Sequence, residues 1–149
     1  MAIEIHDNLD AIEQEWRRFE GVADCTVFQT FDWLASWQRQ VGRRAGVRPA
    51  IVLGRRADGE LMFLMPLSVT AGSVRRLTWL GCELCDYNTP VLAPDFAAQI
   101  AAEDFRALWR EICGRLKNSP QHRFDLIDLS KMPETVGERP IRCSRCRCD

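Results

Sequence analysis

Two continuous apolar runs on either side of a tight-turn sequence constrain the fold of this chain more than any other feature. The runs cover residues 50–53 (Ala-Ile-Val-Leu) and 61–65 (Leu-Met-Phe-Leu-Met), and residues 57–60 (Ala-Asp-Gly-Glu) connect them. An Asp-Gly pair between strands favours a hairpin turn. Strands that are apolar at every position suit burial on both faces. We therefore predict a hairpin at the centre of a sheet that helices cover on both sides.

Amphipathic segments before and after this hairpin predict the covering helices. Apolar residues recur at three- and four-residue intervals from Leu9 to Phe19, after a cap at Asp7 or Asn8, and from Trp33 to Val41, after a cap at Thr30. A third stretch, residues 94–117, keeps one apolar face. Short strands are expected at residues 2–5, 75–80, 89–92 and 123–129. The prediction is an α/β (α+β) fold with a mixed or antiparallel sheet covered by helices.

Length, charge and the N-terminal sequence restrict the class of protein. A chain of 149 residues fits one domain. Its formal net charge of −1 and its dispersed arginine pairs argue against a nucleic-acid partner, which usually requires a net basic face. Apolar runs are shorter than the roughly 20 residues of a membrane span, and the N-terminus lacks signal-peptide features. We therefore expect no membrane partner and a cytoplasmic location.

Seven cysteines raise the question of a metal site. Cys82 and Cys85 form one Cys-x-x-Cys pair and Cys143 and Cys146 form another, which is the arrangement of four zinc-binding thiolates. The intervening stretch is far longer than the about 15 to 20 residues typical of such sites. We predict reduced thiols, with Cys82, Cys85 and Cys113 acting as small apolar core residues, and keep a zinc-binding regulator as an alternative.

Nucleophilic catalysis has no clear base in this sequence. The two histidines are His6, in the first expected strand, and His122, just before the last one. A histidine at the margin of a strand is usually a surface residue, and no Gly-x-Ser-x-Gly motif occurs. We predict that both histidines lie at the surface.

The loop at residues 81–90 is the best candidate for a binding surface. It contains the only tyrosine of the chain beside an acid and an amide, Asp86, Tyr87 and Asn88, all of which can orient a polar ligand. The structural alternative is a simple turn, because Asp, Asn and Thr before a proline are common turn formers. We take Asp86, Tyr87 and Asn88 as candidate substrate-binding residues.

Four segments, taken in order, resemble one known family. They are Phe28-Gln29-Thr30-Phe31-Asp32-Trp33-Leu34, Gly59-Glu60-Leu61 leading to Met65-Pro66-Leu67, Arg76-Leu77-Thr78-Trp79-Leu80-Gly81, and Cys85-Asp86-Tyr87-Asn88-Thr89-Pro90. Together they are similar to the GNAT-superfamily acetyltransferases associated with cellulose biosynthesis, which are related to the Fem-type peptidyltransferases. The similarity runs from Ile3 to Met132.

The resemblance implies an N-acyltransferase that moves an acyl group from acetyl-CoA or another acyl-CoA to an amine or sugar acceptor. Family members continue into a second GNAT-like unit, where the resemblance places acyl-CoA, so this chain corresponds to the N-terminal half and is expected to be inactive alone. Two segments are near misses to the phosphate-binding turn of the family, because each matches its motif only in part: Arg39-x-x-Gly42-x-Arg44 and Arg56-x-x-Gly59-x-Leu61. Both place a large side chain where phosphate must approach the backbone.

The last residues differ from the rest of the chain. We expect residues 1–135 to form the GNAT-like domain and residues 136–149, rich in arginine and cysteine without apolar periodicity, to be disordered. Such a tail would result from reading a GC-rich gene out of frame, so we interpret the chain as truncated. A truncated fold leaves open apolar edges, which makes a noncatalytic protein-interaction domain, or self-association, the alternative function.

Overall fold

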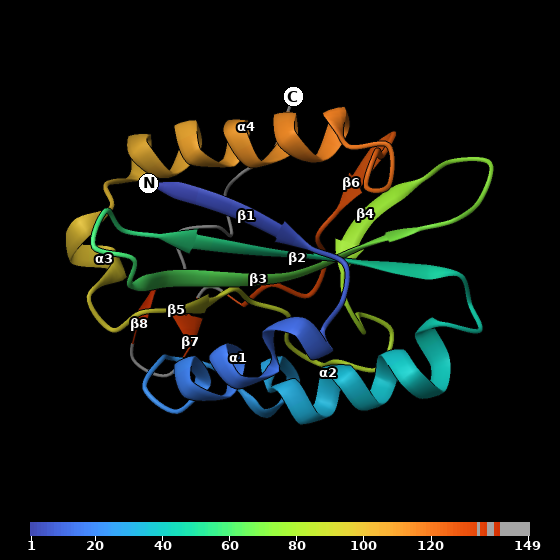
Figure 1. Ribbon diagram of the computed structural model, residues 1–149, viewed down its shortest axis with the longest axis horizontal. Coiled ribbons are helices and arrows are strands. Elements are labelled where there is room, and N and C mark those ends of the chain that lie inside the picture. Colours follow the sequence, from blue (N-terminus) through green and yellow to red (C-terminus); the bar gives the residue numbers. More distant parts are fainter. Residues whose placement is uncertain (134, 137–138, 141–149) are drawn as a thin grey trace.

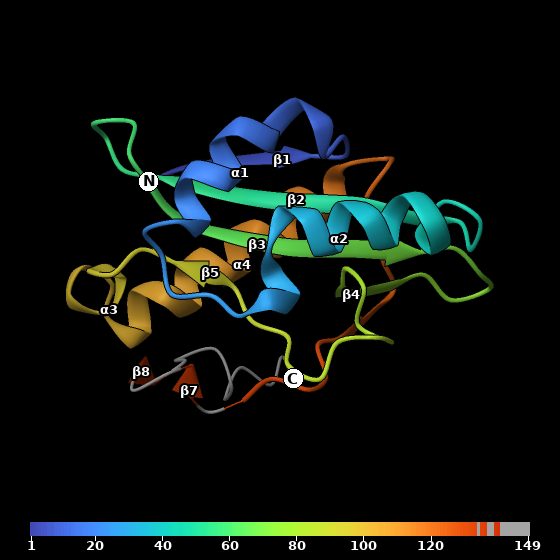
Figure 2. The same ribbon diagram turned by 90° about the horizontal axis from the view of Figure 1, so that it is seen from below.

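A six-stranded sheet lies between two layers of helices. The computed structural model describes residues 1–133, 135–136 and 139–140. One long helix, α4 (Ala102–Asn118), covers one face of the sheet, and α1 (Glu13–Glu20) and α2 (Phe31–Trp37) cover the other (Figures 1 and 2). The predicted helix-covered α/β arrangement is confirmed.

The sheet is mixed, with a single parallel pair among its described strands. Its strand order is β1-β2-β3-β4-β6, with β5 paired to β3, and only β4 and β6 run parallel. The strands are β1 (Ala2–His6), β2 (Val47–Arg55), β3 (Leu61–Thr70), β4 (Arg76–Trp79), β5 (Val91–Leu92) and β6 (Leu126–Asp128).

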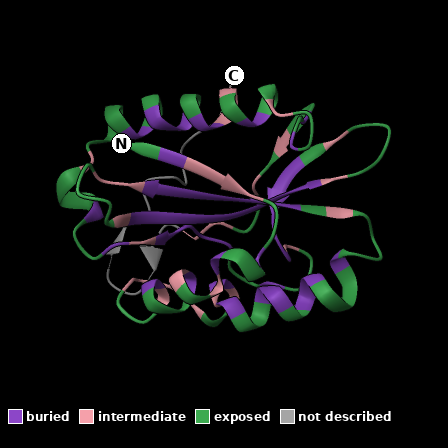
Figure 3. Ribbon diagram, in the orientation of Figure 1, coloured by how far each residue is buried: buried purple, intermediate pink, exposed green. Residues whose placement is uncertain are grey.

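The predicted hairpin of β2 and β3 forms the centre of the core. Residues 50–53 and 62–65 are between 0% and 1% exposed, and both strands are coloured as buried along most of their length in Figure 3. At the turn, Gly59 has φ 90°, a conformation that glycine adopts without steric cost. Burial on both faces therefore explains why these two runs contain no polar positions.

On the edge that faces away from β2, β3 pairs with two different strands along its length. Leu67–Thr70 pairs with β4, whereas Phe63 and Leu64 pair with β5. Between them, the carbonyl of Pro66 accepts a hydrogen bond from the Leu80 amide (2.8 Å), so the strand continues through the proline as expected. The loop at residues 81–90 leaves the sheet at this change of partner.

The second predicted helix buries a different stripe from the one expected. Its first part is α2, and its second part is a π-helical turn, Gln38–Gly42. Phe31, Leu34 and Trp37 are buried, but Trp33 is 36% exposed and Val41 is 39% exposed. The prediction that Trp33 and Val41 belong to the buried face was wrong. The π turn adds a residue to the helical repeat and so rotates Val41 away from the core.

Two 3-10 turns complete this layer, Asp10–Ile12 before α1 and Val27–Gln29 before α2. The Trp16 indole donates a hydrogen bond to the carbonyl of Gln29 (3.0 Å), which joins α1 to the second turn.

The long helix predicted for residues 94–117 is broken into two. α3 (Phe96–Gln99) ends at Ile100, whose φ of −117° and ψ of 110° are extended, and α4 starts two residues later. The break allows Phe96 to contact the rings of both Phe63 (6.1 Å between centroids) and Phe105 (6.3 Å). α4 then returns the chain to β6, beside β4.

The C-terminal prediction of disorder falls for the most part on residues outside the described part. Two short strands are described there, β7 (Thr135–Val136) and β8 (Arg139–Pro140), which pair antiparallel to each other. Within the described ranges, every helix is too short or too polar to cross a bilayer.

Candidate functional site

The loop at residues 81–90 is fixed from one side by the amide of Gln29, which is 2% exposed. Its Nε2 donates to the carbonyl of Tyr87 (2.8 Å). Its Oε1 accepts from the hydroxyl of Thr89 (3.3 Å) and from the hydroxyl (2.7 Å) and backbone amide (3.1 Å) of Thr26. One buried side chain therefore connects the turn before α2 to the loop after β4. The Thr26-x-x-Gln29 spacing is that of a capping box, so the sequence contained a signal for this contact.

Lys131 fixes the same loop from the other side. Its Nζ donates to the carbonyls of Cys82 and Cys85, each at 3.1 Å. Its own carbonyl accepts from the amide of Asn88 (3.0 Å), and the Asn88 side chain donates to the carbonyl of Ser130 (3.4 Å). Lys131 has φ 58°, in the left-handed region that a residue with a Cβ rarely adopts. These hydrogen bonds compensate the backbone strain, and no sequence pattern predicted them.

The three predicted site residues have different environments. Asn88 is 2% exposed and is occupied by its contacts with residues 130–131, whereas Tyr87 is 53% exposed and Asp86 is also exposed. Asn88 therefore shapes the loop, and only Asp86 and Tyr87 present free side chains to a ligand.

Aromatic side chains lie close to this loop. The rings of Phe28 and Trp33 meet edge to face, with their centroids 5.6 Å apart. Trp33 also hydrogen bonds with Cys85 inside the loop, and Leu84 and Tyr87 are exposed on it. Flat rings of this kind pack against the apolar faces of ligands.

Burial disfavours the thiolate form of three of the described cysteines. Burial raises the pKa of the Cys25, Cys82 and Cys85 thiols above the ordinary value. Cys85 is buried and Cys82 packs against the core, as predicted. Cys143 and Cys146, which the zinc hypothesis requires, lie outside the described residues. In the described part of the chain, histidine, cysteine and acidic residues form no cluster of three that could hold a metal ion.

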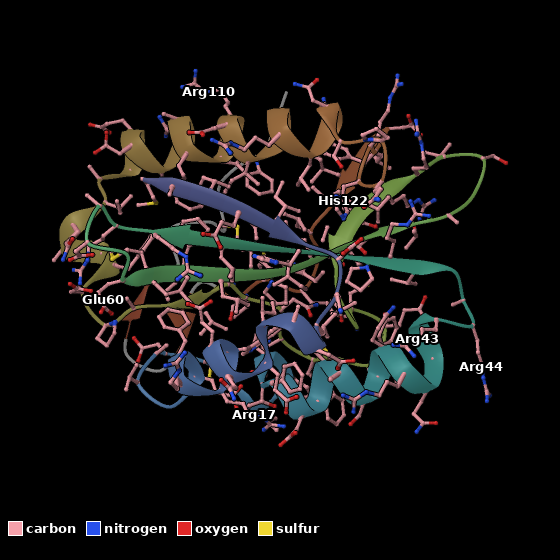
Figure 4. The ribbon with its side chains drawn as sticks, in the orientation of Figure 1. Arg17, Arg43, Arg44, Glu60, Arg110 and His122 are labelled. Atoms are coloured by element: carbon pink, nitrogen blue, oxygen red, sulfur yellow. The ribbon has the colours of Figure 1, made fainter. Side chains whose placement is uncertain are left out.

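His122 was wrongly predicted to lie at the surface. It is 5% exposed, and its ring nitrogens contact the Ser119 hydroxyl (3.1 Å) and the carbonyl of Pro49 (3.2 Å). His122 is labelled in Figure 4. Burial lowers its pKa. The ring therefore connects the end of α4 to β2 and acts as a structural residue. His6 is partly exposed, 3.4 Å from Glu4.

A separate cleft of about 440 Å³ lies beside the hairpin turn. The second half of α1, the turn between β2 and β3, and the segment from β5 to α3 form its walls. Phe19, Leu61 and Ala93 provide apolar lining, and charged residues of both signs surround them: Glu15, Arg18, Arg56, Glu60 and Asp95. No residue of the loop at 81–90 lines this cleft.

Ion pairs hold the walls of the cleft together. Arg55 binds both carboxylate oxygens of Glu15 (2.5 and 2.6 Å) and also Glu4 (3.0 Å). The hydrogen bonds from Arg55 lower the pKa values of both carboxyl groups. Arg56 extends from the hairpin turn to Asp95 before α3 (3.2 Å). The turn, α1 and the start of α3 are thus connected through side-chain charges.

The start of α4 and the two near-miss turns do not fit a bound acyl-CoA diphosphate. A diphosphate prefers free backbone amides and positive charge at a helix start, but the first turn of α4 carries Glu103 and Asp104. At the first near-miss turn, a Cβ on Gly42 would lie 2.0 Å from Oε1 of Gln38, so this side chain covers the backbone that phosphate must approach. The second near miss is the hairpin turn at Gly59, closed by the bond from the Arg56 amide to the Glu60 carbonyl (2.9 Å).

Comparisons of this chain with protein-family models, with curated proteins and with solved structures found no match.

Proposed function

We propose that this chain is the N-terminal portion of a GNAT-type N-acyltransferase, which supplies the acceptor side of the reaction and does not itself bind acyl-CoA. The topology is the observation that carries the proposal. Two helices after β1, an antiparallel β2-β3-β4 meander, and a crossover through α4 into the parallel strand β6 follow the order that the sequence pattern predicts over the residues that carry the resemblance. The acidic start of α4 supports the absence of a diphosphate site in this part.

The loop at 81–90 has the properties that an acceptor-binding surface requires. It is held from both sides by hydrogen bonds to Gln29 and Lys131, so its exposed side chains keep a defined geometry. The Asp86 carboxylate would accept a hydrogen bond from an acceptor hydroxyl or ammonium group. The exposed Tyr87 ring would pack against the apolar face of a sugar. Acyl-CoA would carry the activated thioester, and no step of acyl transfer is assigned to a residue of this chain.

Titration of the purified full chain with acetyl-CoA and with glucosamine tests this proposal. We expect glucosamine to shift the backbone amide NMR signals of residues 81–90, and acetyl-CoA to shift none. Asp86→Asn and Tyr87→Ala should each weaken the glucosamine response, whereas Val74→Ala, at an exposed position in another loop, should leave it unchanged. Glucose and ethanolamine separate sugar recognition from amine recognition. Saturable acetyl-CoA binding would contradict the proposal.

The edge strand β6 favours a second function, a noncatalytic domain that associates with protein. Among the described strands, β6 pairs only with β4, and Leu126 on it is 48% exposed. An edge with unpaired backbone groups and an exposed apolar side chain favours strand addition. Light scattering over a range of concentrations should then show growth in size, which Leu126→Lys abolishes. A monomer at all concentrations would reject self-association.

A further inference from the structure

The cleft beside the hairpin turn contains two charged side chains that form no salt bridge with the described residues. Glu15 is paired with Arg55, and Arg56 with Asp95. The Arg18 guanidinium donates only through Nε, to the Gln14 carbonyl (3.3 Å), and has no ion pair among the described residues. The Glu60 carboxylate, labelled at the hairpin end of the molecule in Figure 4, likewise has no side-chain partner in the described part. One cation and one anion without a salt bridge in the described part of the chain thus line the same cleft, and the charge of Arg18 also acts on the nearby Glu15 carboxylate.

The floor and the size of the cleft suit a small organic molecule. Phe19 and Ala93 are 7% and 8% exposed, and Leu61 is half-buried beside them. The volume of about 440 Å³ lies within the roughly 300 to 1,000 Å³ of small-molecule sites. An apolar group of a ligand can therefore be buried on this floor while its polar groups reach the charged walls.

Ion pairs and a backbone hydrogen bond link the walls of the cleft to one another. Arg56 bridges the hairpin turn and Asp95 (3.2 Å), and Arg55 joins the hairpin to Glu15 on α1. The backbone amide of Asp24 bonds to the Leu92 carbonyl (3.1 Å), which ties the segment after α1 to β5. A cleft that is already organised loses less conformational entropy on binding.

We propose that this cleft binds a small zwitterion with an apolar side chain, namely a free amino acid or a dipeptide. Arg18 binds the carboxylate, Glu60 binds the ammonium group, and the side chain packs on Phe19 and Leu61. A polyanion is disfavoured by Glu15, Glu60 and Asp95, and a polycation by Arg18 and Arg56. This site is independent of the proposed acyltransferase function, because it shares no residue with the loop at 81–90.

Calorimetric titration of the full chain with L-leucine and with leucyl-leucine tests the site, and the two probes differ in the separation of their charges. At least one of them should bind. N-acetyl-leucine, which has no ammonium group, and leucinamide, which has no carboxylate, should bind about tenfold more weakly, since a charged hydrogen bond contributes about 1.5 kcal/mol. Failure of both zwitterions to bind, or equal binding of the singly charged analogues, would overturn the proposal.

Exposed positions allow variants that keep the fold. Arg18→Gln should weaken binding of the zwitterion about tenfold and remove the discrimination against leucinamide, and Glu60→Gln should remove the discrimination against N-acetyl-leucine. Arg43→Gln is the matched control, because Arg43 is an exposed arginine away from the cleft. Loss of affinity in Arg43→Gln equal to that in Arg18→Gln would indicate nonspecific charge and reject the site.

Discussion

The loop at residues 81–90 and the cleft beside the hairpin turn are held in place by different kinds of interaction. The loop depends on the neutral, buried amide of Gln29 and on Lys131 bound to backbone carbonyls. The cleft depends on ion pairs whose side chains are partly exposed. Buried hydrogen bonds are costly to break and insensitive to salt, whereas partly exposed ion pairs contribute little and are screened. The part of the loop held by Gln29 should therefore respond little to ionic strength, whereas the cleft walls should respond to pH and ionic strength.

The largest effect is expected at the loop, for Gln29→Leu. The change leaves the Tyr87 carbonyl and the Thr26 amide without these partners in a partly buried environment, which should lower the free energy of unfolding by about 2 kcal/mol. Urea denaturation measures it. Gln14→Leu, on the exposed side of α1, is the control and should change stability by less than about 0.5 kcal/mol. Equal effects of the two changes would mean that the amide does not hold the loop.

A smaller effect is expected for Lys131→Met. Loss of the bonds to the Cys82 and Cys85 carbonyls should cost about 1 kcal/mol and speed hydrogen exchange of the loop amides. Lys131→Gly loses the same bonds but relieves the left-handed backbone strain, so its net cost should be near zero. If glycine destabilises the protein as much as methionine does, the strain argument is wrong.

In the cleft, Glu15→Gln should lower the free energy of unfolding by about 1 kcal/mol at neutral pH, since the ion pair with Arg55 is only partly buried. Arg55 lowers the pKa of Glu15, so the stabilisation is complete above the ordinary value of 4.5 and is lost as pH falls through the lowered folded value. The difference in stability between wild type and Glu15→Gln, followed by thermal unfolding, should therefore shrink on acidification below pH 4.5. A difference independent of pH would exclude the ion pair as its cause.

The smallest effect is expected for Asp95→Asn, which removes the link from Arg56 to the start of α3. We expect the free energy of unfolding to fall by about 0.5 kcal/mol at low ionic strength and not to change at high salt. The reason is that the Arg56 and Asp95 side chains are 34% and 48% exposed, so salt screens their attraction. Denaturation at two salt concentrations measures this, with Gln29→Leu as the salt-independent comparison. A salt-independent loss in Asp95→Asn would remove the contrast between the two regions.

Local patterns predicted most of the fold. The alternation, the apolar runs and the Asp58-Gly59 turn predicted β1, β2, β3 and the other strands of the sheet within a few residues, because each signal lies within one short segment. The break at Ile100 escaped prediction, since the apolar stripe continues across it and only the packing of Phe96 on Phe63 requires it. The candidate site was predicted in position, as the loop after β4, but Asn88 proved to be a structural member of it.

The sequence alone determined the elements of this protein, the central hairpin and the helix-covered sheet, because hydrophobic periodicity and turn chemistry act between neighbours in the chain. Only the tertiary structure decided that His122 is buried against Pro49, that Lys131 holds a loop 46 to 49 residues away, and that Arg18 and Glu60 line one cleft without a salt bridge to any described residue. These properties depend on which distant groups meet and which charges find partners. Contacts of that kind are set by packing in three dimensions, and local sequence patterns do not encode them.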